Sequence, residues 1–230
     1  MKKISISTLL LLLTTSILSC NHEEANSSNE SNIVAKHISG NHQNQFEEYG
    51  ILSYDLFELY MNSNYNSTTL EDISKDVSDL LTYHSSLNPA TIHLNNDFEF
   101  QIESLKANPV EMLEQIILEN QMSSNAETKI YEIIKLITEN SSITKDELFQ
   151  HLITIENNVI SDQNISTQEK DVILLSSSLL RYSLYDNGHD DDKDWDLSVG
   201  NFIVSFYGAS ISIQDALLLN LSNRILEYTN

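Results

Sequence analysis

Apolar residues recur at helical spacing along most of the chain from about residue 42 onward. Several of these segments open with a hydroxyl residue followed three positions later by glutamate, the capping box that begins many helices. A further helix is expected over 46–61, another over about 97–106, and another from Pro109, which follows the cap residue Asn108. The pattern predicts an all-α fold, an irregular multi-helix bundle over residues 41–230. The expected capping boxes are Thr68 with Glu71, Ser124 with Glu127, Thr144 with Glu147, and Ser166 with Glu169.

The C-terminal third follows a different pattern. Residues 197–214 carry no charged side chain and mix large apolar residues with glycine and serine. Because the apolar part is nearer the length of a core helix than of a membrane span, a buried helix pair or packed hairpin is favoured over a membrane-inserting or self-associating segment. The amphipathic stretch 216–228 is expected to close the domain.

Residues 1–19 have the layout of a signal peptide. Lys2 and Lys3 precede an apolar stretch, and Ser19 stands directly before Cys20, the single cysteine of the chain. Residues 17–20, Ile-Leu-Ser-Cys, resemble the lipobox of bacterial lipoproteins, although Leu18 is bulkier than the small residue usual at its position. The resemblance implies cleavage before Cys20 and lipidation of its thiol, with diacylglycerol and palmitate-type acyl chains as the membrane anchor. The alternative is an ordinary secretory signal in which the cysteine has no role.

The residues after Cys20 are expected to be a flexible tether, because the stretch 20–40 is rich in serine and asparagine and too polar to bury a core. Glu23 and Glu24 resemble the surface-export signal of Bacteroidota lipoproteins, and position 21 lacks the aspartate that retains lipoproteins in the inner membrane. The expected location is therefore the outer membrane, with display on the cell surface favoured over a face toward the periplasm. A plain solvated linker would have the same composition.

The charge balance excludes two classes of partner. The formal net charge is −22, and removal of Lys2 and Lys3 with the signal would make it −24. Such a field repels nucleic acid and anionic lipid headgroups, so neither is expected as a partner. Cationic partners and divalent metals are still possible. The alternative is that the acidity only keeps the protein soluble.

The densest polar cluster is the loop 186–196, in which many carboxylates could gather around calcium. The spacing does not match an EF-hand, because the required glycine and final glutamate are missing. The alternative is a solvated connector in which an aspartate caps the next helix. The candidate metal ligands are Asp190, Asp192, Asp194 and Asp196. No other cofactor is expected.

No catalytic motif is present: the sequence has no zinc-protease histidine pair, nucleophile elbow, P-loop or dinucleotide fingerprint. His84 lies on the apolar side of its helix and is interpreted as a core or boundary residue, while His151 could be core or ligand. Aromatic residues on the first helix could form a binding face, but their helical spacing favours the core. These aromatic residues are Tyr49, Tyr54, Phe57 and Tyr60.

Two short stretches of the chain form a further pattern. They consist of Asn44, Phe46, Glu47, Gly50 and Asp55 in the first helix, and of Arg181-Tyr182-Ser183 followed by Trp195. These stretches resemble an uncharacterised family of helical proteins from Bacteroidota, although the chain departs from the family pattern at Ser53 and Tyr54, where a His-Asn pair is expected. The resemblance implies a helical fold and an envelope location, and no activity.

The leading hypothesis is a membrane-anchored helical lipoprotein that binds an envelope protein, a peptide or a second copy of itself without catalysing a reaction. One alternative is a calcium-dependent binding module that uses the aspartate loop. Another is an enzyme whose site is assembled from residues distant in the sequence.

Overall fold

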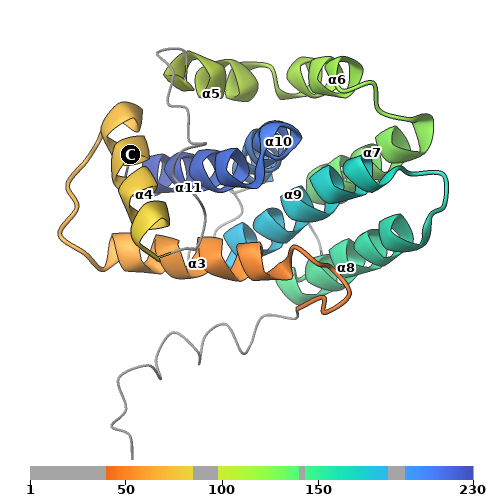
Figure 1. The fold of residues 1–230 in the computed structure, drawn as a ribbon, viewed down its shortest axis with the longest axis horizontal. Coiled ribbons are helices and arrows are strands. Elements are labelled where there is room, and N and C mark those ends of the chain that lie inside the picture. Colours follow the sequence, from red (N-terminus) through yellow and green to blue (C-terminus); the bar gives the residue numbers. More distant parts are fainter. Residues whose placement is uncertain (1–39, 85–97, 140–142, 186–194, 230) are drawn as a thin grey trace, which may run out of the picture. The chain divides into compact units, whose positions relative to one another are not determined.

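The computed structural model describes residues 40–84, 98–139, 143–185 and 195–229, all of which belong to the compact unit Ala35–Asn230. The described residues form helices and no strand, so the prediction of an all-α fold is confirmed (Figure 1). The helices are α3 (Glu47–Met61), α4 (Leu70–His84), α5 (Phe98–Ala107), α6 (Pro109–Glu119), α7 (Ser124–Glu139), α8 (Lys145–Ser161), α9 (Thr167–Tyr185), α10 (Trp195–Ile211) and α11 (Ile213–Thr229).

Two of the expected capping boxes are confirmed. The Thr144 hydroxyl accepts the backbone N–H of Glu147 at 3.3 Å, and the Glu147 carboxylate accepts the N–H of Thr144 at 2.9 Å. Ser166 and Glu169 make the same reciprocal pair at the start of α9. Pro109 occupies the first turn of α6, as predicted, although the Asn108 side chain makes no cap hydrogen bond.

The other two boxes were predicted one residue away from the actual caps. At the start of α4, the hydroxyl of Thr69 accepts the N–H of Asp72 at 3.2 Å. At the start of α7, the hydroxyl of Ser123 accepts the N–H of Ala126 at 3.3 Å, and Ser124 is already the first helical residue. In both places neighbouring hydroxyl residues offer alternative caps.

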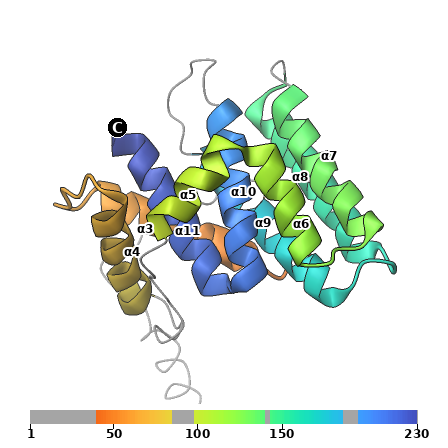
Figure 2. The same ribbon diagram turned by 90° about the horizontal axis from the view of Figure 1, so that it is seen from above.

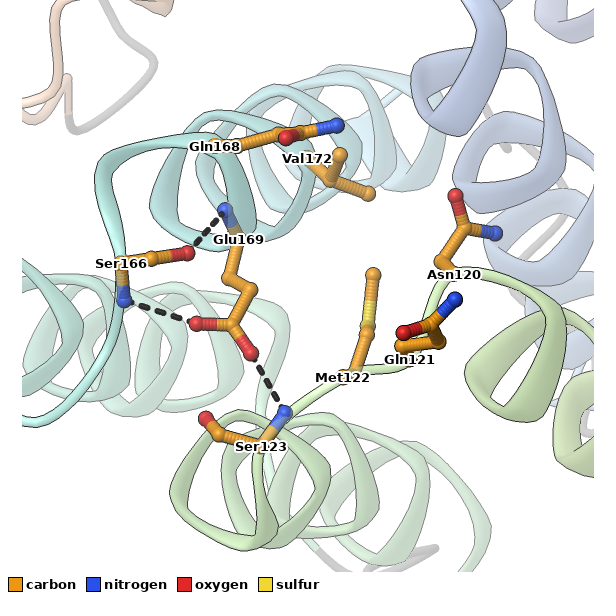
Figure 3. A pocket seen from close by; sticks show the side chains of 8 residues that line it. All are labelled: Asn120, Gln121, Met122, Ser123, Ser166, Gln168, Glu169 and Val172. Atoms are coloured by element: carbon orange, nitrogen blue, oxygen red, sulfur yellow. Dashed lines mark hydrogen bonds between the residues drawn. The ribbon is translucent and has the colours of Figure 1, made fainter.

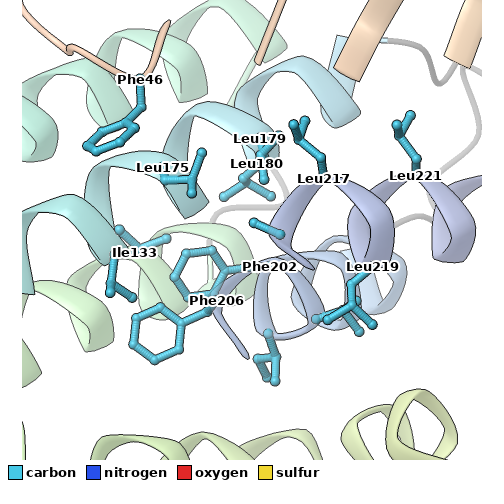
Figure 4. Close-up of a cluster of buried hydrophobic side chains, with 14 of the residues drawn as sticks. Phe46, Ile133, Leu175, Leu179, Leu180, Phe202, Phe206, Leu217, Leu219 and Leu221 are labelled. Carbon is cyan, nitrogen blue, oxygen red and sulfur yellow. The ribbon is translucent and has the colours of Figure 1, made fainter. Parts of the chain in front are cut away.

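Helices α9, α10 and α11 form the centre of the domain and contact one another (Figures 1 and 2). Every residue from 172 to 184 on α9, and from 216 to 225 on α11, is buried. The prediction that 216–228 is amphipathic was therefore wrong for most of its length, because α3, α4, α9 and α10 all pack against α11. Figure 4 shows the apolar side chains that meet here, including Leu179, Phe202, Phe206 and Leu217.

Residues 197–211 belong to one helix, α10, which is buried from Val199 to Phe206 and pairs with α11. The two helices approach closely where a Cβ on Gly208 would lie 2.6 Å from the Cα of Ala216. Ser212 alone separates them, and its hydroxyl accepts the N–H of Asp215 at 3.0 Å to begin α11. In the described part of the chain, no helix combines the length and apolarity that a membrane span requires.

The remaining helices pack one face inward. Helices α3 and α8 contact α9, α4 contacts α11, and α5, α6 and α7 contact α10, as the two views of the ribbon show (Figures 1 and 2). The aromatic residues of α3 lie in the core or partly buried at its edge, as predicted. His84 is exposed at the end of α4, with its ring 4.8 Å from that of Tyr83, so its interpretation as a core or boundary residue was wrong. His151 is also exposed.

Candidate functional site

The structure tests few of the predicted site residues. Cys20 and the loop residues Asp190, Asp192 and Asp194 lie outside the described residues. Asp196 lies in the first turn of α10, and its side chain also falls outside the description. Among the residues that are described, no three histidine, cysteine or acidic side chains are grouped so as to hold a metal ion.

A deeply buried polar cluster surrounds the guanidinium group of Arg181 on α9. Its Nε donates to the carboxylate of Glu156 on α8 at 2.9 Å, and its terminal nitrogens donate to the carboxylate of Glu47 at the start of α3. The Tyr182 hydroxyl donates to Glu47 at 2.8 Å, and the Asn41 amide donates to Glu156 at 2.8 Å. This set, which we call the Arg181 clamp, ties the first described residues to α8 and α9.

In the clamp, burial and the neighbouring charges shift the pKa of Arg181 in opposite directions. Burial lowers the pKa of Arg181, but the adjacent carboxylates of Glu156 and Glu47 outweigh it, so this pKa is raised. Burial, reinforced by the Glu47 charge, also raises the pKa of Tyr182. Arg181 and Glu156 have no exposed surface, and each makes hydrogen bonds to its neighbours. A ligand could not reach these groups, and the clamp is therefore a structural element.

The contacts around the clamp also bring residues 44–55 against residues 174–182 of α9. A Cβ on Gly50 would come within 2.4 Å of both Ser178 and the Tyr182 ring, so α3 needs glycine to pack here. The amide of Asn44 donates to the carbonyl of Leu174 at 3.0 Å. These residues hold the first helix on α9, which is a role in folding.

A second polar array links α3, α10 and α11. The Ser53 hydroxyl donates to the Asn220 amide oxygen at 2.8 Å, and the Asn220 nitrogen donates to Ser205 at 2.9 Å. Arg224 donates to Ser53 at 3.2 Å and lies 4.3 Å from the centroid of the Phe57 ring. The array is buried and gives the interhelical contacts fixed partners.

A polar pocket opens where the α6–α7 turn meets the start of α9 (Figure 3). Its volume is about 340 Å³, at the small end of the range for ligand sites. Met122 points from the turn toward Val172 on α9, so these two side chains supply an apolar floor. The lining residues are Asn120, Gln121, Met122, Ser123, Ser166, Gln168, Glu169 and Val172.

Glu169 holds the two sides of this pocket together. Its carboxylate accepts the backbone N–H of Ser123 at 2.5 Å and that of Ser166 at 2.7 Å, so one side chain caps both α7 and α9. Burial raises the pKa of Glu169 and is the largest single influence, but the hydrogen bonds from Ser123 and Ser166 together outweigh it and lower this pKa to about 2. The carboxylate is therefore ionised at neutral pH, and the positive ends of two helix dipoles balance its charge.

The turn itself is strained at Gln121. Gln121 is the one non-glycine residue with positive φ, 50°, in the part of the chain that the structure describes. The Met122 N–H donates to the carbonyl of Ile117 at 3.1 Å, and the Gln121 N–H donates to that of Leu118 at 3.0 Å. This is a Schellman motif, in which the left-handed residue is usually glycine. A glutamine here carries a conformational cost that glycine would avoid.

The amide side chains at the rim are available to a ligand. Gln121 and Gln168 are exposed, and neither side chain makes a hydrogen bond within the described residues. The nitrogen of Asn120 donates to the carbonyl of Ile116 at 2.8 Å, which leaves its oxygen as an acceptor. The rim therefore offers both donors and acceptors above the apolar floor.

A larger cavity, of about 580 Å³, lies between α4, α5 and α11. Two charged side chains line it: Lys106, which is paired with Glu227 at 2.8 Å, and Glu103, which is exposed. The hydroxyl of Thr69 donates to Asp72 at 2.8 Å at the start of α4. Because Lys106 and Thr69 are already engaged, this cavity offers a ligand fewer polar groups than the pocket beside Gln121.

No protein-family model, curated protein or solved structure matches this chain. The evidence for the candidate site is therefore its geometry alone.

Sequence reasoning singled out Glu169 as a helix cap and missed the pocket around it. One signal was present at Gln121, because a helix that ends without glycine or asparagine at the left-handed position departs from the usual pattern. The contact between Glu169 and Ser123 joins residues 46 positions apart, and no local pattern indicates it.

Proposed function

We propose that this chain is a membrane-anchored helical lipoprotein that acts as a non-enzymatic binding module and captures a partner in the cell envelope through the pocket between the α6–α7 turn and α9. The observation that carries the proposal is the unengaged amide rim at Gln121 and Gln168, on a turn that keeps a strained, non-glycine residue. Strained backbone of this kind is concentrated at functional sites.

The geometry of the pocket favours binding over catalysis. Glu169, the only titratable side chain among the lining residues, stays ionised because its pKa is lowered to about 2, and it is occupied by two backbone N–H groups. A general acid or base at neutral pH needs a pKa much nearer 7. The pocket therefore has groups suited to recognition and none tuned for proton transfer.

The anchor belongs to the same proposal. The lipobox and the acidic residues after it support an acylated Cys20 in the outer membrane, with the helical domain displayed outward on its tether. Metabolic labelling with an alkyne fatty acid should mark the wild-type chain and leave a Cys20→Ala variant unmarked. Protease treatment of intact cells should remove the domain, and equal labelling of both forms would contradict the anchor.

Site-specific photocrosslinking in intact cells tests the binding role. A photoreactive residue placed at Gln168 should capture a discrete partner, because this side chain stands at the rim of the pocket. The matched control places the same residue at Thr82, which is exposed on α4 and does not line the pocket. A Gln121→Ala change should reduce capture at position 168. Capture at both positions alike, or capture that Gln121→Ala leaves unchanged, would contradict the proposal.

A further inference from the structure

The structure also indicates what kind of group the pocket accepts. We propose that it binds an uncharged peptide segment of two or three residues in extended conformation, with a small apolar side chain between Met122 and Val172 and its peptide groups on the amides of Gln121 and Gln168. This inference rests on the proposed function and names the chemical class of the ligand.

The amide rim matches a peptide backbone. A primary amide presents a donor and an acceptor side by side, which is the complement of the N–H and C=O of a peptide group. Gln121 stands on the α6–α7 turn and Gln168 on the first turn of α9, so a chain lying across the pocket would meet one amide on each side (Figure 3). The oxygen of Asn120 adds an acceptor for a further N–H.

The charge in the pocket favours a neutral ligand. The carboxylate of Glu169 accepts the N–H groups of Ser123 and Ser166, the residues directly before α7 and α9, and the positive ends of the helix dipoles offset its negative charge. An ammonium group would compete with these N–H groups, and an anion would meet the carboxylate. A peptide group has neither difficulty, because it carries no net charge.

The size and floor of the pocket distinguish a peptide from a sugar. A volume of about 340 Å³ accommodates a short segment rather than a large cofactor. The floor consists of a flexible methionine and a valine, and methionine adapts to apolar side chains of different shape. None of the eight lining residues that the structure describes is aromatic, so this part of the lining has no flat ring on which a sugar face could stack.

Methyl NMR of the chain as isolated from cells tests the inference. The chain has three internal methionines, so ¹³C-methyl labelling gives Met122 as the reporter in the pocket and Met61 and Met112 as controls outside it. The probe is the capped tripeptide acetyl-Ala-Leu-Ala-N-methylamide. We expect a saturable shift of the Met122 signal with a dissociation constant of about 1 mM or tighter. An analogue N-methylated at the central peptide nitrogens should bind several-fold more weakly, because it lacks the N–H donors.

Two variants give the inference a further test. Gln121→Ala and Gln168→Ala should each weaken tripeptide binding by about three- to tenfold, since each removes one hydrogen-bonding partner. The matched control is Gln115→Ala, which removes an exposed amide on α6 outside the pocket and should leave binding unchanged. Unchanged Met61 and Met112 signals would show that each variant is folded.

Other results would overturn the inference. These are equal binding of the tripeptide and its N-methylated analogue, a Met122 shift with N-acetylglucosamine and none with peptide, or no Met122 shift at peptide concentrations up to about 10 mM. If the tripeptide fails while crosslinking at position 168 still depends on Gln121, the ligand class is wrong and the binding role stands. If both fail, the proposed function fails as well.

Discussion

Replacing Gln121 by glycine should make the protein more stable and less able to bind its partner. Gln121 has a φ of 50° in the Schellman motif that ends α6. For a residue with a Cβ, the left-handed conformation costs about 1–2 kcal/mol. Glycine avoids this cost but loses about 0.5–1 kcal/mol through its larger conformational freedom in the unfolded chain. The difference between the two effects lies between about 0 and 1.5 kcal/mol, and we expect a net gain near its middle, about 0.5–1 kcal/mol in the free energy of unfolding.

Thermal unfolding measures this gain. For a domain of roughly this size, 1 kcal/mol corresponds to a shift of about 2–4 °C in Tm, so Gln121→Gly should raise Tm by about 1–4 °C. The matched control is Gln121→Ala, which removes the same amide and keeps the left-handed strain. Its Tm should stay close to that of the wild type. The difference between the two variants isolates the backbone from the side chain.

In binding, unlike in stability, Gln121→Gly and Gln121→Ala should behave alike. Both Gln121→Gly and Gln121→Ala lack the amide, so both should bind the capped tripeptide about equally weakly. At a functional site, a residue that supports binding often lowers the stability of the fold, and Gln121 would be such a residue. A Gln121→Gly variant that is no more stable than Gln121→Ala would refute the strain argument. Wild-type binding by either variant would refute the role of the side chain.

Other changes test the residues that support the fold. Because the pKa of Glu169 is lowered to about 2 in the folded chain, its stabilising contribution is present above the unfolded pKa of about 4.3 and is lost as the pH falls toward 2. Glu169→Gln should therefore lower Tm at pH 7 and weaken the dependence of Tm on pH between about 4.5 and 2; an unchanged acid profile would contradict the double cap. Arg181→Met should cost about 3–5 kcal/mol of unfolding free energy, because it leaves two buried carboxylates without their cation. Glu156→Gln should cost less, because Arg181 keeps the carboxylate of Glu47. Equal losses of unfolding free energy in urea denaturation would contradict this charge balance. Gly50→Ala should destabilise by about 1–3 kcal/mol despite its better helix propensity, because the added Cβ would lie 2.4 Å from the Tyr182 ring; a rise in Tm would show that propensity outweighs packing.

The positions of the helices could be predicted from the sequence because their signals are local. A capping box places its two members within one turn, as Ser166 and Glu169 do, so the sequence carries both halves of the contact. Where two hydroxyl residues are adjacent, the capping-box pattern does not decide which of them caps the helix. Ser123 caps α7 in place of Ser124, and Glu169 from another helix accepts the Ser123 N–H. Tertiary contacts therefore decide a register that local patterns leave open.

The burial of α11 and the assembly of the sites could not be predicted in the same way. Asn220, Asn223 and Arg224 look like the polar side of an amphipathic helix, yet each is buried and hydrogen-bonded to α3 or α10. From the sequence alone, a polar residue is expected to be exposed, because the buried partner that would satisfy its hydrogen bonds cannot be identified. The partners lie far along the chain, as in the contact of Arg181 with Glu47, which joins residues 134 positions apart.

The Arg181 clamp and the polar pocket share α9 but should act independently. Gln168 and Arg181 are separated by 13 positions of continuous helix, which corresponds to about 20 Å along its axis. Changes to distant sites with no shared partner add in free energy. Arg181→Met should therefore lower Tm while the protein that remains folded binds the capped tripeptide as the wild type does. If binding fell with stability in this variant, α9 would have to transmit a change from the clamp to the pocket, and the clamp could not be assigned to folding alone.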